Sequence, residues 1–584
     1  MNALILPATL AAALAAPALT PAERDAMARI TAAEISAHIR FLADDQLGGR
    51  FPGTPGDELA EKYLATELEA MGYEPGATGL DGQASWFQPV PLVEHVASVP
   101  PEVVFSRKGE KLALPTGPGT AAQLVIHSLG DVDDASVANA GLVFVGYGIV
   151  APEHGWDDYR NVDVKGKIAV VLNFNPPWAG QAEDGSPGGG AGGGGIGAAQ
   201  ADGRAADGPP DRKVRLWYGR WDYKYLEAAR HGAVGALVIH TPESAGYPWQ
   251  VVTTSNGPRA FGLPKEGDPD PHLPFEGWIA HDAAARLFGW AGKDLAKLTE
   301  KAKAGRLHGV PLGLGATFHM PVARRTVMSA NVVGRLPGSD PKLRGEAVLF
   351  TAHHDHLGER VPPVAGQHNV YAGALDNASG CAAVLAVARG LAAEPPRRSV
   401  VVAFVTAEEQ GLLGSRWYAR HPTVAAGKIA ADINLDGVNI HGPTADVGFL
   451  DFGRTSLDHL VREAAATQDR IVHGDPYPDR GYPYRSDDFS LARVGVPAIR
   501  LNGGPHYLGK PESYGREQVA LYEREHYHQT SDVYPASPAA WDLTGAVQDA
   551  QLDLLVGERI GNQDALPGWK AGDEFAAARK APAR

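Results

Sequence analysis

Strand-like and helix-like runs alternate along the chain from about residue 328 onwards. VLFTA, VVVAFVTA and IAADINL have the length and β-branched content of buried strands, and SGCAAVLAVARGLAA is an apolar run of helical length. This alternation predicts a mostly parallel α/β sheet with helices on both faces. Each of the three strand-like runs is followed directly by polar residues. These are His353 after the first run, Glu408 and Glu409 after the second, and Asp436 after the third. Because ligands bind at the carboxyl ends of strands in such a sheet, we expect these side chains to meet at one edge.

Two further residues complete a set of metal-binding side chains. Asp376 lies in GALDNASG just before a helix, and His528 lies in YHQTSD. Two histidines, three carboxylates and one additional glutamate are a composition typical of a two-metal hydrolytic centre. Alone, Asp376 is typical of a helix N-cap, and the Glu408–Glu409 pair is typical of acids at a helix N-terminus. The prediction therefore depends on the whole set.

Neighbouring histidines compete for the ligand roles. His354 and His356 lie beside His353, and His506 and His526 precede His528. The residues alone do not choose between His353 and its two neighbours.

Residue types also indicate supporting roles. One of two adjacent glutamates can bind metal while the other accepts a proton from water. Asp355 stands two residues after His353, where its carboxylate can accept the second ring N–H of that histidine. Tyr527 can donate a hydrogen bond to a developing oxyanion, although a packing aromatic is an equal alternative.

Bulk properties limit the partners and the organisation. A chain of 584 residues is too long for one core and predicts two or three domains. The net charge of −15 argues against nucleic acid as the main partner. Cys381 is the only cysteine, so no intramolecular disulfide is possible, and its apolar surroundings predict a buried thiol.

The pattern along the chain gives five segments. Residues 1–18 are expected to be a signal peptide, since the apolar run ILPATLAAALAA leads into Ala16-Pro17-Ala18, which fits a small-residue cleavage site. This predicts a secreted or periplasmic protein. No other apolar run is long enough for a membrane span. The remaining segments are the start of the main domain (19–99), an insertion (100–320) with a glycine-rich surface loop (185–211), the main α/β domain (321–560) and a polar tail (561–584) that we expect to be frayed.

Taken in order, these motifs resemble the co-catalytic zinc metallopeptidases of family M28, aminopeptidase type. The resemblance covers about 328–540 and extends to 31–95, and the insertion, with FVGYGI and VKGKIAVV, resembles the protease-associated domain of many members. The family implies a zinc exopeptidase fold, phosphorylase/hydrolase-like, with a mixed, mostly parallel sheet flanked by helices. It also implies an inserted β-rich domain.

The resemblance assigns roles by position. His353, Asp376 and Asp436 would hold one of two Zn²⁺ ions, and Asp376, Glu409 and His528 would hold the other, with Asp376 bridging. Glu408 would be the general base, Asp355 would orient His353, and Tyr527 would be the oxyanion donor. Arg485 and Asp487 would lie near the substrate; Asp488 departs from the histidine that the family often has after this Ser-Asp pair.

The implied function is a di-zinc aminopeptidase that removes N-terminal residues from peptides or proteins by a metal-bound hydroxide. Two alternatives stay open. A carboxypeptidase of the same fold would need a basic pocket, and the motif segments show only Arg485. A receptor-like, non-catalytic binding protein on the same scaffold is disfavoured by the intact ligands and base.

Overall fold

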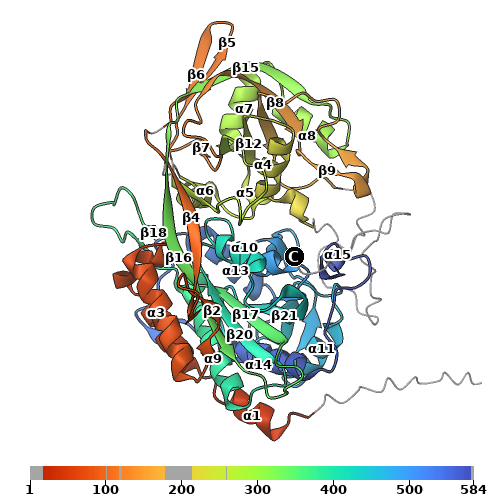
Figure 1. Cartoon of the computed structure of the whole chain (residues 1–584). Helices are drawn as coiled ribbons and strands as arrows, with labels where there is room; N and C mark the ends of the chain where they lie inside the picture. Colours follow the sequence, from red (N-terminus) through yellow and green to blue (C-terminus); the bar gives the residue numbers. More distant parts are fainter. Residues whose placement is uncertain (1–17, 100, 118–120, 178–213, 258, 581–584) are drawn as a thin grey trace, which may run out of the picture.

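The computed structural model describes residues 18–99, 101–117, 121–177, 214–257 and 259–580. Residues 1–17 of the expected signal peptide and the glycine-rich stretch 185–211 lie outside these residues. The described chain forms two bodies, each built on an eight-stranded sheet. Figure 1 shows the two bodies stacked end to end, with the long strands β4 (Phe87–Ala97) and β16 (Val322–Leu336) running between them.

The first body contains the strands that the alternating pattern predicts. Across its sheet the main path is β13 (Arg259–Gly262), β4, β16, β20 (Ser399–Val405), β17 (Ala347–His353), β21 (Ile429–Asn434) and β24 (Ala498–Ile499). β20, β17, β21 and β24 are parallel, whereas β16 is antiparallel to both β20 and β4. The expected mixed α/β fold is confirmed, and its parallel part is the half that carries the predicted ligands.

Alternate residues of the central strands enter two different cores. Phe350 of β17 packs in a core with helices α2 (Ala32–Leu42), α9 (Gly380–Ala393) and α14 (Thr544–Asn562). Its neighbour Leu349 packs on the other face, in a core that includes Tyr418 of α10 (Leu413–Arg420) and Leu491 of α12 (Asp488–Arg493). The strands are therefore buried on both faces, which explains their continuous apolar sequences. Cys381 of α9 is fully buried, as expected, and its thiol donates to the carbonyl of His353 at 3.1 Å.

The second body is built from the insertion. Across its sheet the strands are β6 (Glu110–Leu114), β5 (Val103–Arg107), β15 (Val310–Phe318), β8 (Val137–Gly146), β11 (Ile168–Leu172), β12 (Gly235–His240), β14 (Phe275–Ala280) and β7 (Leu124–His127). Helices α4 (Trp221–Arg230), α7 (His281–Trp290) and α8 (Leu295–Lys303) pack against it, so the body is α/β rather than purely β. β13 belongs to this stretch of sequence but pairs with β4 of the first sheet, which joins the two bodies.

The tail is packed, so the expectation of a frayed segment is wrong for its described part. α14 extends to Asn562, and the chain then runs to α15 (Ala576–Lys580). Phe575 is buried in a cluster with Phe489, and Arg454 binds the carboxylate of Asp573 at 2.9 Å. These contacts anchor an alanine-rich sequence whose composition alone suggested fraying. Within the described residues, no helix is both long and apolar enough to cross a membrane.

Candidate metal centre

The predicted side chains meet at the carboxyl edge of the parallel strands. His353 is the last residue of β17 and is paired with Val405, the last residue of β20. Glu408 and Glu409 follow β20, and Asp436 follows β21, whose Asn434 pairs with Thr351 of β17. Neighbouring parallel strands that end in register bring the residues after them together, as the sequence predicts.

The first group of donor atoms comes from three separate segments. Nε2 of His353 lies 3.3 Å from Oδ1 of Asp376 and 3.4 Å from Oδ1 of Asp436. Ligands about 2 Å from a tetrahedral zinc ion are separated by about 3.3 Å, so this spacing fits a zinc ion between them. The nitrogen and carboxylate donors are also the types that zinc binds.

The second group shares Asp376 with the first. Nε2 of His528 lies 3.2 Å from Oδ2 of Asp376 and 2.9 Å from Oε2 of Glu409. Asp376 thus presents one oxygen to each histidine, which is the arrangement that a bridging carboxylate requires.

Of the four rival histidines, only His356 has a donor atom within the centre. His356 lies in the second group, with Nδ1 2.6 Å from Oε1 of Glu409. His354 points to Asp57, 3.3 Å away, and belongs to another buried cluster. His506 contacts Asp446 and His526 contacts Ser531, outside both groups.

The Asp376 loop is held by its neighbours. The carboxylate of Asp532 accepts the backbone N–H groups of Leu375 at 3.0 Å and Asp376 at 3.1 Å. The side-chain oxygen of Asn377 accepts the N–H of Gly380 at the start of α9, at 2.9 Å. The capping role that a lone Asp-Asn pair suggests therefore belongs to Asn377, and the Asp376 carboxylate faces the two histidines.

The two glutamates differ in electrostatic environment. Burial raises the pKa of the Glu408 carboxyl well above its ordinary value, and Glu408 lines a cavity beside the centre. Burial also raises the pKa of Glu409, but the adjacent imidazoles of His528 and His356 outweigh it and bring the pKa to about 2. This difference fits a proton acceptor at Glu408 and an ionised ligand at Glu409.

Asp355 contacts both parts of the centre. Its carboxylate accepts the backbone N–H of Glu408 at 3.0 Å and lies 3.8 Å from Nδ1 of His353. Its own backbone carbonyl is closer to Nδ1, at 3.3 Å. The ring of His353 is thus oriented mainly by the carbonyl of Asp355, while the carboxylate fixes the turn that carries the glutamates.

The second body reaches the centre through α6 (Trp249–Ser255). Ser255 Oγ and His528 Nδ1 form a hydrogen bond of 2.6 Å, and Gln250 donates to Gln529 at 2.6 Å. The ring of Tyr247 lies beside that of Tyr527. No motif in the sequence marks Ser255, because its role depends on how the two bodies pack.

The remaining predicted residues divide between cavity and interior. Tyr527 and Arg485 line the cavity, and Nη2 of Arg485 donates to the Tyr527 hydroxyl at 3.0 Å. Asp487 is fully buried and lies outside the lining of the cavity.

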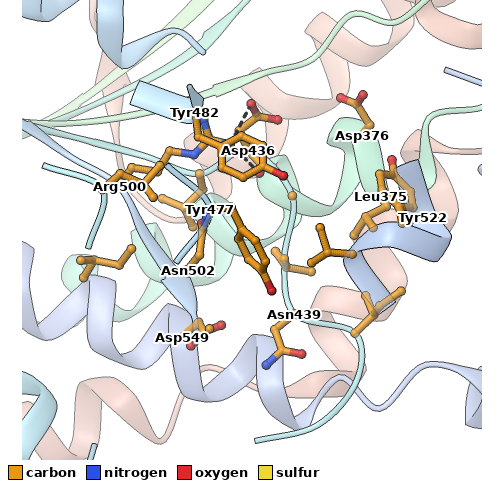
Figure 2. Close-up of a pocket in the computed structure, with 18 of the residues that line it drawn as sticks. Leu375, Asp376, Asp436, Asn439, Tyr477, Tyr482, Arg500, Asn502, Tyr522 and Asp549 are labelled. Atoms are coloured by element: carbon orange, nitrogen blue, oxygen red, sulfur yellow. Dashed lines mark hydrogen bonds and ion pairs between the residues drawn. The ribbon is translucent and has the colours of Figure 1, made fainter. Parts of the chain in front are cut away.

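Arg500 also lines the cavity, and the sequence analysis did not identify it. Its Nη2 lies 3.2 Å from Oδ2 of Asp436, and Figure 2 shows it beside Asp436 and Tyr482. The one feature of the sequence that could have pointed to Arg500 is its position as a cation within the apolar run GVPAIRLN.

Parts of the chain are similar to known proteins. The model of peptidase family M28 matches residues 331–555. A probable zinc metalloprotease of Leptosphaeria maculans is 33% identical over 138 residues, which are 23% of this chain and 30% of that protein. A vacuolar membrane protease of Candida dubliniensis is 31% identical over 140 residues, which are 24% of this chain and 13% of that protein. The matched segments therefore span less than a third of these curated relatives.

A solved structure extends the similarity to both bodies. An aminopeptidase from Aneurinibacillus sp. strain AM-1 has a TM-score of 0.52 and 17% identity, over 93% of this chain and 97% of that chain. At this level of identity the likeness concerns the fold.

Proposed function

Because residues 331–555 belong to peptidase family M28, we propose that the protein is a two-zinc exopeptidase of the aminopeptidase type. The observation that carries the proposal is the Asp376 carboxylate, whose oxygens face His353 at 3.3 Å and His528 at 3.2 Å. A carboxylate that presents one oxygen to each of two donor groups suits two ions bridged by it.

Each side chain has a task in this proposal. Zinc, when bound, would polarise the scissile carbonyl and lower the pKa of water. His353, Asp376 and Asp436 would hold one ion, and Asp376, Glu409 and His528 would hold the other. Glu408 would accept the proton of the attacking water and return it to the departing amine.

Tyr527 would stabilise the oxyanion. Arg485 donates to its phenol oxygen, which leaves the phenol O–H free to point into the cavity. A donor fixed in this way costs little reorganisation when negative charge develops on the substrate carbonyl.

The charge around the centre favours a substrate ammonium group. Asp376, Glu408 and Asp436 all line the cavity at its metal end. N-acetylation of a peptide that the zinc-loaded protein cleaves should therefore abolish cleavage, while amidation of its C-terminus should have little effect. Mass spectrometry of the two digests tests the direction of attack.

One observation favours a carboxypeptidase as second candidate. Arg500 is only 5% exposed, and its Nε and Nη1 have no hydrogen-bond partner among the described residues. With Arg485 it can offer two guanidinium groups to a substrate carboxylate. The same digests decide: cleavage that survives acetylation and is lost on amidation would identify a carboxypeptidase.

We also propose that the second body is a protease-associated domain that shapes access to the centre. Its contacts through Ser255 and Gln250 support this role. Secretion to the periplasm or the exterior, suggested by the N-terminal sequence, is part of the same proposal; the mature N-terminus of the exported protein would test it.

A further inference from the structure

We propose that the cavity beside the metal centre accepts an arginine or lysine side chain of the substrate's N-terminal residue, with Asp553 as the acid that binds its cationic end. This inference rests on the proposed aminopeptidase function and names its substrate class.

The cavity starts at the metal centre and extends into the first body. His353, Asp376, Glu408 and Asp436 line its outer end. It then passes between the segment after Asp436, strand β25 (Leu501–Gly503) and helix α14. Figure 2 shows Asp549 of α14 at the opposite end from Asp376, with Asn439 at the same end as Asp549. A substrate held at the metals by its scissile bond can thus extend its first side chain towards α14.

The walls suit a long aliphatic chain. Tyrosine rings and small or branched apolar residues form them, among them Leu435, Val438, Tyr482, Val519, Tyr522 and Ala550. Such walls bury the methylene groups of lysine or arginine as readily as those of leucine or methionine. The choice between these side chains depends on the inner end of the cavity.

Two carboxylates of α14 form the inner end. Asp549 and Asp553 lie one helical turn apart, and both line the cavity. Asp549 already has a cation, because Nη2 of Arg470 lies 2.6 Å from its Oδ1. Asp553 is 2% exposed, and its Oδ1 has no hydrogen-bond partner among the described residues.

An unpaired carboxyl in such a place is costly. Burial raises the pKa of Asp553 well above its ordinary value, and the neighbouring Asp549 raises it further. A guanidinium or ammonium group that reaches Asp553 supplies the missing partner and allows it to ionise. A neutral side chain of the same length leaves the carboxyl unpaired, and an acidic one adds repulsion.

The other charges that line the cavity do not compete for this role. Glu523 binds Arg480 at 2.9 Å, and Asp475 accepts the backbone N–H of Tyr477 at 2.7 Å. The cations Arg485 and Arg500 lie at the metal end, where they contact Tyr527 and Asp436. A basic side chain therefore finds its unpaired acid at the far end of the cavity, away from both guanidinium groups.

The test compares kcat/KM for N-terminal Arg, Lys, Met and Leu p-nitroanilides on zinc-loaded protein. The wild type should prefer Arg and Lys over Met. Asp553→Asn should lower kcat/KM for Arg on the order of 10²-fold and change that for Met little, because only the ion pair is lost. Glu558→Gln is the matched control: it removes an acid of the same helix that does not line the cavity, and it should leave the Arg-to-Met ratio unchanged. Turnover of Met by Asp553→Asn shows that this variant is folded.

A wild type that prefers Met, or an Asp553→Asn variant with the wild-type Arg-to-Met ratio, would overturn the inference and leave the aminopeptidase function standing. Calorimetry with argininamide and norleucinamide measures the affinity of the cavity for a basic and a neutral side chain, and it does not require turnover. If the wild type cleaves no free N-terminus but binds argininamide more tightly than norleucinamide, and Asp553→Asn loses this preference, the proposed function fails and the ligand class of the cavity holds. Equal binding of the two amides would overturn the inference independently of catalysis.

Discussion

The hydroxyl of Ser255 and Nδ1 of His528 form a hydrogen bond of 2.6 Å across the boundary between the two bodies. When Nδ1–H donates to the hydroxyl, Nε2 keeps its lone pair and faces Asp376 and Glu409. A serine of the inserted sequence therefore fixes the orientation of a proposed zinc ligand in the first body. The packing of the second body and the geometry of the metal centre are coupled through this contact.

Ser255→Ala should weaken zinc binding at the His528 position by about 10–100-fold, because the imidazole loses the partner that orients it. A chelator competition titration measures the two zinc affinities separately. Thr254→Ala is the matched control, since the Thr254 hydroxyl bonds only to backbone carbonyls of its own helix. Equal affinities in Ser255→Ala and Thr254→Ala would show that the contact does not hold the ligand.

Glu408→Gln should retain both zinc ions and reduce kcat by about 10²–10⁴-fold, because it removes proton transfer alone. Glu409→Gln should instead lower zinc content, since the carboxylate beside His528 is lost. Metal analysis and kcat of the two variants check the assignment. If Glu408→Gln is the variant that loses zinc, Glu408 is the ligand and Glu409 is the general base.

His528→Gln and His356→Gln should differ in the number of zinc ions that they retain. His528 faces two carboxylates of the centre, whereas His356 contacts Glu409 from its other oxygen, Oε1. The first variant should lose one zinc ion and the second should keep both with reduced affinity. If His356→Gln is the variant that loses an ion, the rival ligand is the correct one.

His272 predicts a pH-dependent contribution to stability in the second body. Burial lowers its pKa, but the carboxylates of Asp268, 2.9 Å away, and Glu276 outweigh burial and raise the pKa to about 10. A folded-state pKa above the ordinary value of 6.5 means that the stabilisation is complete below that pH and is lost as pH rises towards 10. His272→Gln should therefore lower Tm by a few degrees at about pH 6 and by little at about pH 10.

Differential scanning calorimetry at the two pH values tests this. His281→Gln, which alters a half-exposed histidine of the same body, should shift Tm little at either pH. A loss of Tm in His272→Gln that is the same at both pH values would rule out the ion pair as its source.

Much of the centre could be predicted from the sequence because each ligand is marked locally. His353, Glu408, Glu409 and Asp436 follow apolar strands, and parallel strands in register bring their ends together. The same reasoning predicted the mixed α/β sheet. It did not choose among the neighbouring histidines, since their directions depend on the turn after β17.

Residues that act through packing were not predictable. Ser255 is an ordinary helix-end serine until the two bodies meet. Arg500 and Asp553 sit in apolar runs where a charge has no local explanation. Only the fold shows that Asp553 lines a cavity. The packing of the tail was not predicted because its anchors, Asp573 and Phe575, stand beside an alanine-rich stretch that has no other large apolar side chain.

The most direct test of the account is zinc content measured together with peptide turnover, on wild type and on Asp376→Asn. We expect two zinc ions per chain in the active wild type. Asp376→Asn should lose zinc affinity at both positions and should lose turnover, because Asp376 faces both histidines. Full activity with a single tightly bound ion, or an Asp376→Asn variant that keeps two ions and turnover, would contradict it.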